Sequence, residues 1–224
     1  ARSGGGIWIP CNHLMRAAGV ADSFEEARTY LQGTVGERSP LASREMFLSQ
    51  SVKMIQWLDR KSDLQCSYMQ GHADYYPELP GGKVQGRALE PRLFDGNALG
   101  ADLARLRPPV IPIPAGLTFT AGEYKQLGLV MRTWQGRGTA LRIGLRLLGA
   151  RLTGRKMLMM GQALIGRLRL SLKKRGIPVW LDAPMKELIV EGGRITGVRV
   201  EKDGQPVEVI ARKGVILAAG CFAF

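Results

Sequence analysis

Residues 187–220, ELIVEGGRITGVRVEKDGQPVEVIARKGVILAAG, contain short apolar or alternating runs separated by turn dipeptides. Gly192-Gly193 and Asp203-Gly204 are typical of two-residue hairpin turns. The pattern predicts a β-meander, followed by an apolar strand that ends in small residues. The expected strands are residues 187–191, 197–201, 207–211 and 214–219, with a further short strand at 179–181.

Helices are predicted before the meander. Residues 161–175 end in a cluster of cations, which suits the C-terminal end of a helix. Ser23-Phe-Glu-Glu26 is a capping box that begins a helix reaching Gly33. Apolar residues at helical spacing predict another helix over residues 43–60. We also expect a short helix within 12–19, a short strand within 65–70, extended chain over 108–114 and helices within 120–150.

Residues 72–91, HADYYPELPGGKVQGRALEP, form a polar stretch rich in proline and glycine that carries Tyr75 and Tyr76. It predicts a long irregular loop. Such loops in compact domains often serve function. We therefore take this loop as a candidate part of the functional site.

The composition is that of a globular protein. Of 224 residues, 45% are hydrophobic and 23% charged, which excludes a disordered chain and a collagen. The longest apolar run, residues 215–224, is too short to span a bilayer. The cysteines Cys11, Cys66 and Cys221 are odd in number and widely spaced. This pattern excludes a disulfide framework and favours reduced thiols in the cytoplasm.

The net charge of +13 comes from one segment. Of 32 lysines and arginines, 13 lie between Lys125 and Arg175, and no acidic residue lies between Glu123 and Asp182. Within 125–158, arginines alternate with leucines, which is typical of a solvated face on a packed helix. A second hypothesis is a membrane-surface helix with a basic rim, giving peripheral membrane contact through 125–158. Nucleic acid is not an expected partner, because no aromatic stacking platform accompanies the charge.

Two segments rich in small residues could let backbone approach a ligand: SGGGIWIP at 3–10 and the strand end Leu217-Ala-Ala-Gly220. Further recognisable pieces are AGVADSFEEARTYL (18–31), DYYPELPGGKVQGRALEP (74–91), GQALIGRL (161–168), ELIVEGGRITGVRVEKDGQ (187–205) and ARKGVILAAG (211–220). In this order, the set resembles the flavoprotein family of 3-ketosteroid Δ1-dehydrogenases, which are related to the fumarate reductase flavoproteins. Residues 107–158 match that family weakly and are interpreted as an insertion.

The resemblance implies an α/β fold: a partial Rossmann-like FAD-binding domain with a β-meander, plus the start of a helical and mixed catalytic domain. Residues 1–65 and 159–224 would belong to the FAD-binding domain, and 66–158 to the catalytic domain with its basic helical insertion. The family's GxGxxG unit, which holds the FAD pyrophosphate at a helix N-terminus, is not found in the sequence. We therefore expect an internal piece of a longer protein, inactive and poorly soluble when isolated.

The resemblance also implies FAD as the cofactor. The segment 3–6 matches backbone that lies along the isoalloxazine ring. Pro184 matches a position whose main chain approaches the adenosine, although proline has no N–H to donate. Residues 218–220 match the strand end beside the diphosphate and ribose, with Cys221 where the family usually has glycine. The implied cofactor-binding residues are Ser3, Gly4, Gly5, Gly6, Pro184, Ala218, Ala219 and Gly220.

The implied reaction is dehydrogenation of a 3-ketosteroid at C1–C2, with an unidentified external electron acceptor. In the family, flavin N5 takes the C1 hydride and a tyrosine takes the C2 proton. Another tyrosine and a backbone amide hold the C3 oxygen. Tyr75 matches a tyrosine that hydrogen-bonds to the proton-abstracting one and lowers the cost of its ionisation. Tyr76 is the alternative register.

Other functions match the sequence less well. His13 and His72 lie far apart with no carboxylate cluster, so no metal site is expected. A GxSxG hydrolase elbow is missing. Related flavoproteins remain as alternatives: a Δ4-dehydrogenase of 5α-steroids, or a fumarate-reductase-like enzyme whose Arg87 and Arg92 would hold two carboxylates. A basic module that binds membrane or nucleic acid is the alternative outside enzymes.

Overall fold

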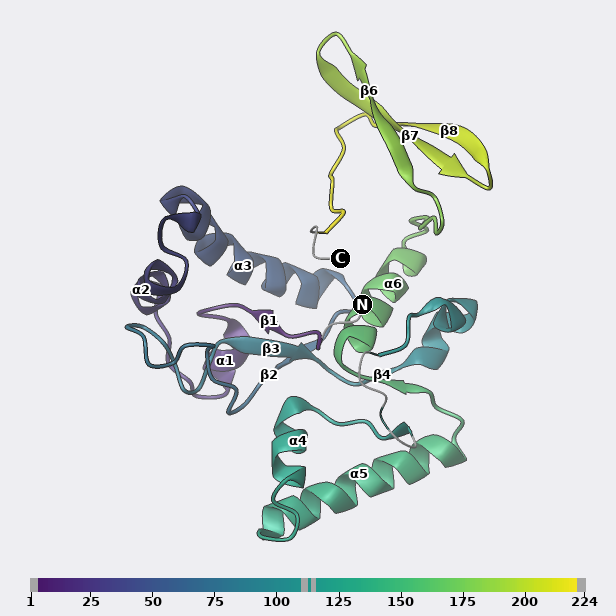
Figure 1. Ribbon diagram of the computed structural model, residues 1–224. Helices are drawn as coiled ribbons and strands as arrows, with labels where there is room; N and C mark the ends of the chain where they lie inside the picture. Colours follow the sequence, from purple (N-terminus) through teal and green to yellow (C-terminus); the bar gives the residue numbers. More distant parts are fainter. Residues whose placement is uncertain (1–3, 110–112, 114–115, 221–224) are drawn as a thin grey trace. The chain divides into compact units, whose positions relative to one another are not determined.

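The computed structural model describes residues 4–109, 113 and 116–220, which belong to two compact units, 1–176 and 177–224. The first unit mixes helices with short strands, and the second is a β-meander (Figure 1). The prediction for 108–114 falls largely outside the described residues. No helix of the described residues is long and apolar enough to cross a membrane.

A three-stranded antiparallel sheet lies at the centre of the first unit. Its order is β1 (Ile7–Trp8), β3 (Ala88–Pro91), β2 (Cys66–Tyr68). Ile7 is paired with Leu89, and Ser67 with Glu90. The strand predicted within 65–70 is confirmed. The prediction of one loop over 72–91 is wrong at its end, because residues 88–91 form the buried central strand, stabilised by partners distant in sequence.

Four helices surround this sheet. The capping box predicted for α2 (Phe24–Thr34) is confirmed, since the Glu26 N–H donates to Ser23 Oγ at 3.2 Å and the Ser23 N–H donates to Glu26 Oε2 at 3.1 Å. The short helix α1 spans His13–Ala17 and is capped by Asn12. Helix α3 runs from Leu41 to Lys61 and α6 from Met160 to Lys174, both close to the predicted bounds. A 3₁₀ turn, Gly36–Arg38, lies between α2 and α3.

The main hydrophobic core forms where α3 and α6 pack on the sheet. Ile55 of α3 and Leu89 of β3 are buried there with Ile9, Leu64 and Cys66, and Leu164 and Leu168 of α6 pack against them. Burial raises the pKa of the Cys66 thiol to about 11. The core therefore joins residues from both ends of the first unit.

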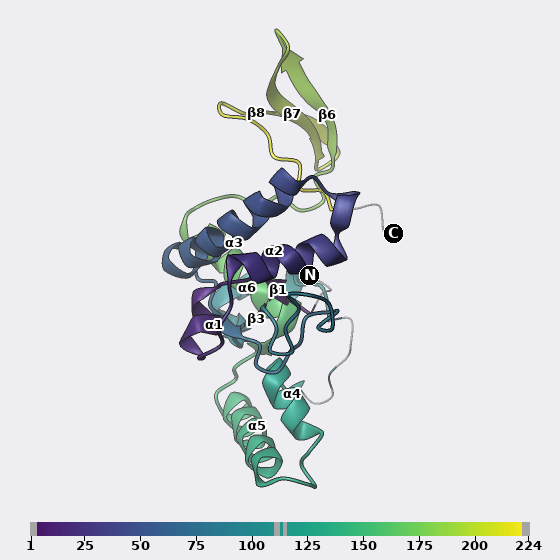
Figure 2. The same ribbon diagram turned by 90° about the vertical axis from the view of Figure 1, so that its left-hand side faces the viewer.

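The rest of the first unit contains a smaller sheet and a helix pair. Strand β4 (Phe94–Asp95) pairs with β5 (Met157–Leu158), and the 3₁₀ segment Gly96–Arg105 packs beside them on α6. The helices predicted within 120–150 are confirmed as α4 (Ala121–Leu127) and α5 (Trp134–Leu152). Figures 1 and 2 both place this pair on the opposite side of the central sheet from α2 and α3.

The second unit is the predicted meander, with strands β6 (Met185–Glu191), β7 (Arg194–Lys202) and β8 (Gln205–Ile210) in that order. Both hairpins close through two residues with positive φ: Gly192 (55°) and Gly193 (76°), then Asp203 (53°) and Gly204 (75°). Two positive φ values in succession define the type I′ turn, whose twist matches that of paired strands. The hairpin predictions are therefore confirmed.

Two predicted strands of this unit are not formed. Residues 179–181 and 214–219 have no strand structure. A strand is stable only where neighbouring strands accept and donate its backbone hydrogen bonds. Among the described residues, no strand pairs with either stretch.

Candidate functional site

Within the glycine segment, residues 4–6, Gly5 lies against the start of α6. Gly5 is buried with φ +73°, and a Cβ there would lie 2.7 Å from the Met160 carbonyl carbon and 2.8 Å from the Gly161 nitrogen. Only glycine fits such a close backbone approach. Among the described residues, no side chain caps the N-terminus of α6, whose backbone dipole favours negative charge.

Gly4 and Gly6 differ from Gly5 in their surroundings. Both are exposed; a Cβ on Gly4 would meet no atom within 4 Å, and one on Gly6 would only touch the Leu89 oxygen at 3.9 Å. The segment thus presents backbone without side chains on an open side, a surface that fits the flat ring of a cofactor. Ser3, the remaining residue assigned to this segment, lies outside the described residues.

A buried ion cluster holds the tyrosine loop, residues 72–87, to this segment. Arg87 is fully buried and donates from Nη1 to Asp74 Oδ2 at 2.7 Å, and from Nη2 to Asp22 Oδ1 at 2.9 Å. Its guanidinium carbon lies 5.6 Å from the ring centres of both Trp8 and Tyr30. The cluster therefore joins β1, α2 and the loop.

Asp74 is the acceptor that links these elements. Its carboxylate accepts the indole N–H of Trp8 at 2.8 Å and the backbone N–H of Lys83 at 3.1 Å, in addition to Arg87. Trp8 follows the glycine segment by two residues, and Asp74 directly precedes the two tyrosines. The glycine segment and the tyrosines are thus connected through one buried carboxylate.

The two tyrosines differ in how they are held. Tyr75 is 93% exposed, whereas Tyr76 is 55% exposed and its backbone N–H donates to the Tyr30 hydroxyl at 3.2 Å. Both side chains are exposed to solvent and are therefore accessible to a ligand. The role assigned to Tyr75 stays a prediction.

The proposed use of Arg87 as a carboxylate clamp is wrong. All of its donor groups face Asp22, Asp74 and the Gly81 carbonyl inside the protein, so none is offered to a substrate. Arg92 is exposed, and its backbone is bonded to Gln65 and Arg167. The predicted pair of cationic clamps is therefore not present.

The predicted adenosine and diphosphate contacts lie in the second unit. The Pro184 carbonyl accepts the Glu201 N–H at 3.1 Å, which ties it to the meander. Residues 218–220 are exposed and outside any strand, and Gly220 has φ +89°. The assignments of Pro184, Ala218, Ala219 and Gly220 to FAD stay predictions. Cys221 lies outside the described residues.

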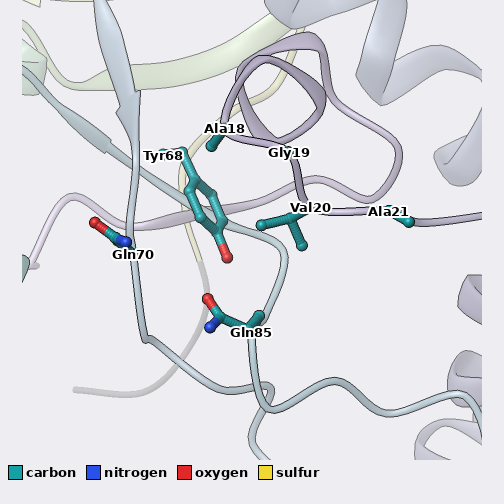
Figure 3. Close-up of a pocket in the computed structure, with 7 residues that line it drawn as sticks. All are labelled: Ala18, Gly19, Val20, Ala21, Tyr68, Gln70 and Gln85. Atoms are coloured by element: carbon teal, nitrogen blue, oxygen red, sulfur yellow. The ribbon is translucent and has the colours of Figure 1, made fainter.

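A cavity of about 430 Å³ opens beside the tyrosine loop, between the α1–α2 connection and the end of β2 (Figure 3). Figure 3 shows the Tyr68 hydroxyl pointing toward Val20 and Gln85. This hydroxyl is buried and has no hydrogen-bond partner among the described residues, and burial raises its pKa. A buried polar atom without a partner suits a wall that receives a polar ligand group.

Sequence reasoning missed Tyr68 and Gln85 as cavity residues. The cavity is assembled from three segments far apart in the chain, and no spacing pattern predicts such an assembly. Residues 18–21 stand out in the sequence only as part of the stretch 18–31, which resembles the dehydrogenase family. No group of three or more metal-ligating side chains is found in the part of the chain that the structure describes.

The bare glycine segment is a surface that suits a flat cofactor, and comparison with known proteins identifies the class. The FAD binding domain family matches residues 1–224, so the chain belongs to that family and its cofactor is FAD. Within it, the chain is similar to the 3-oxosteroid 1-dehydrogenase of Mycolicibacterium smegmatis, with 38% identity over 227 residues that cover 99% of this chain and 40% of the relative.

Two further proteins extend this comparison. The crystal structure of 3-ketosteroid delta1-dehydrogenase from Sterolibacterium denitrificans, in complex with 1,4-androstadiene-3,17-dione, matches 98% of this chain and 40% of its own, with a TM-score of 0.83 and 33% identity. The 4-oxocyclohexanecarboxylate 2-dehydrogenase of Sinomonas cyclohexanicum is 30% identical over 99% of this chain and 37% of the relative.

These matches confirm the predicted α/β FAD-binding fold and the resemblance to 3-ketosteroid Δ1-dehydrogenases. The chain spans about two fifths of the length of the relatives it matches. The division into segments 1–65, 66–158 and 159–224 stays a prediction.

Proposed function

We propose that the protein containing this chain is an FAD-dependent 3-ketosteroid dehydrogenase that forms a double bond between C1 and C2 of the steroid A ring. The supporting observation is the match of nearly the whole chain, in sequence and in fold, to dehydrogenases of this class. The reaction removes a hydride from C1 and a proton from C2. Bound FAD supplies the hydride acceptor.

The glycine segment would contribute to cofactor binding in two ways. Gly4 and Gly6 would allow the flat ring to approach the backbone, because neither position carries a side chain on its open side. Gly5 would fix the path of the segment by its close packing on α6. Ser3, Pro184, Ala218, Ala219 and Gly220 would complete the cofactor contacts, as the resemblance implies.

The tyrosine loop would contribute to proton removal. A phenol with a pKa near 10 is a weak base at neutral pH, so a donor that stabilises its phenolate lowers the barrier. Tyr75 would donate such a hydrogen bond to the tyrosine that takes the C2 proton. Tyr76 could act in its place, and the anchoring of its backbone by Tyr30 supports that register.

The test uses the full-length FAD-bound protein and a 3-keto-4-ene steroid. Without oxygen, adding the steroid should bleach the flavin absorbance band as the 1,4-diene forms. Tyr75→Phe should lower kcat about a hundredfold, within the usual contribution of acid–base groups, with little change in FAD content. A fall confined to Tyr76→Phe would move the role to Tyr76. A bound flavin that no 3-ketosteroid bleaches would contradict the proposal.

A smaller cyclic ketone is the second candidate substrate, since one relative is named for 4-oxocyclohexanecarboxylate. Comparing kcat/KM for this acid and for the steroid in the same anaerobic assay separates the two. Dominant turnover of the acid would replace the steroid assignment while keeping the flavin chemistry.

A further inference from the structure

The indole of Trp8 makes one hydrogen bond that joins the glycine segment to the tyrosine loop. Its Nε1–H, the only polar group of the side chain, donates to Asp74 Oδ1 at 2.8 Å, between residues 66 positions apart. Trp8 is the second residue after Gly6, and Asp74 directly precedes Tyr75. A single bond therefore connects the segment that we assign to FAD with the residue that precedes the candidate catalytic phenol.

The packing around the indole fixes the direction of this N–H. The ring stacks on Phe47 of α3, with ring centres 6.0 Å apart and an angle of 11° between the planes, and its centre lies 5.9 Å from that of Tyr30 of α2. The Arg87 guanidinium carbon lies 5.6 Å from the indole centre. The Trp8 backbone pairs with Ala88 in the central sheet. Because ring and backbone are both held, the position of Nε1 follows that of β1.

The acceptor is held as firmly at the other end of the bond. The Asp74 side chain is fully buried, and it also accepts Arg87 Nη1–H at 2.7 Å and the Lys83 N–H at 3.1 Å. The Asp74 backbone N–H donates to the Lys83 carbonyl at 2.9 Å. The carboxylate thus fixes the backbone that leads into Tyr75, whose own side chain is 93% exposed.

We propose that Trp8 is a positioning residue for Tyr75, which couples the placement of the glycine segment at FAD to the placement of the tyrosine phenol. The inference rests on the proposed function, in which that segment binds FAD and Tyr75 assists proton removal. Hydrogen bonds to ionised acceptors are about twice as strong as neutral ones, and a buried acceptor that loses its donor is costly. A tryptophan that served packing alone would need its ring but not its N–H.

The variant Trp8→Phe in the full-length FAD-bound protein keeps an aromatic ring and removes the N–H. We expect kcat for the 3-keto-4-ene steroid, per bound flavin, to fall about tenfold with KM changed less than about twofold, because a misplaced phenol affects the transition state more than ground-state binding. In the Tyr75→Phe background, the same substitution should change kcat by less than about twofold, since residues that act through one another are not additive. Trp57→Phe, at an exposed tryptophan on α3, is the matched control and should behave as the wild type.

A second measurement requires no turnover. Chymotrypsin cleaves after exposed aromatic residues, and Tyr75 is such a site, whereas Tyr76 is followed by Pro77, which blocks cleavage there. Added FAD should slow cleavage of the full-length apoprotein after Tyr75, in the wild type and in Trp57→Phe alike. In Trp8→Phe, that protection should be about fivefold smaller, because the two sites have lost their coupling.

Any of three results would overturn the proposal: an unchanged kcat in Trp8→Phe, protection by FAD equal to that of the wild type, or a fall in kcat that persists undiminished in the Tyr75→Phe background. The last result would mean that Trp8 acts on the structure in general and not through the tyrosine. If Tyr75→Phe and Tyr76→Phe both turned over the steroid like the wild type, the proposed function of the tyrosines would fail instead. The protection by FAD would still test the link from Trp8 to the loop, so the two proposals fail separately.

Discussion

Arg87 and Arg199 each bind two carboxylates, but in opposite surroundings. Arg87 lies fully buried between Asp22 and Asp74, which are 65 and 13 residues away in the sequence. Arg199 lies partly exposed on β7 and pairs with Glu187 and Glu208 of the neighbouring strands. The first cluster connects segments that are far apart in the sequence. The second follows from strand register alone, which is set by local turns.

The difference shows what determines each unit. In the first unit, distant segments are held by buried charges whose loss leaves partners without compensation. In the meander, each strand is placed by a two-residue turn, and the ion pairs on its surface are screened by water. The two units should therefore respond differently to equivalent substitutions.

The largest expected effect is that of Arg87→Met. It leaves Asp22 and Asp74 charged and buried, which should lower the free energy of unfolding by about 3–5 kcal/mol. Urea unfolding of the full-length FAD-bound protein, followed by circular dichroism, measures it. Arg199→Met is the matched control and should change little. Adding Asp22→Asn and Asp74→Asn to Arg87→Met should recover part of the loss; comparable losses in the two single arginine variants would remove the contrast.

Glycines with positive φ sharpen the same comparison. Gly5→Ala combines a strained φ with a clash against α6 and should cost about 2–3 kcal/mol. Gly204→Ala is strained as well but faces open space, so about 1 kcal/mol is expected. Thermal unfolding of both variants in the full-length protein measures the difference. A Gly204→Ala effect as large as that of Gly5→Ala would show that the backbone strain, and not the packing on α6, dominates.

The smallest expected effect concerns pH. Burial raises the pKa of Glu90, whose carboxylate accepts the Ala121 N–H, above its ordinary value of 4.5. The folded protein binds this proton more tightly than the unfolded chain, so stability falls as pH rises from 4.5 toward the folded pKa. Glu90→Gln should therefore be slightly more stable than the wild type at neutral pH, with the advantage disappearing in acid.

Glu123 is the matched carboxylate, because its pKa is shifted in the opposite direction to that of Glu90. The hydrogen bond from Arg146 lowers its pKa, so its contribution is present above 4.5 and is lost as pH falls through the folded value. Glu123→Gln should be less stable than the wild type at neutral pH and approach it in acid. Unfolding curves between pH 4 and 8 give the stability of each variant relative to the wild type. If both variants were more stable, or both less stable, at neutral pH, the opposite pKa shifts of Glu90 and Glu123 would be contradicted.

Local signals allowed much of the fold to be predicted. The capping box at Ser23, the turns at Gly192-Gly193 and Asp203-Gly204, and the helical spacing in 43–60 each act over a few residues, and each was confirmed. Strand β3 was missed because residues 88–91 have no strand-like pattern and are held by partners about 80 and 20 residues away. The predictions of strands at 179–181 and 214–219 were wrong, because the sequence pattern does not reveal whether a partner strand is present.

The candidate site was predictable only in part. The Gly-rich sequence at 3–6 indicates that glycine is needed there. The cause at Gly5 is the close approach of Met160, which is 155 residues away in the sequence. Arg87 was considered as a carboxylate clamp only for the alternative, fumarate-reductase-like enzyme. Its burial depends on Asp22, which no local pattern connects to it.

Cys66 is buried in the main hydrophobic core, so the reactivity of its thiol reports whether the core of the first unit is open. With a thiol pKa of about 11, only about one molecule in a thousand carries the reactive thiolate at pH 8 while the core is closed. An alkylating reagent should therefore modify this position mainly in molecules whose core has separated. Cys11, half-buried, would react sooner, and the meander between residues 177 and 220 has no cysteine. The rate of alkylation at position 66 would thus measure how often the core of the first unit opens, without any introduced label.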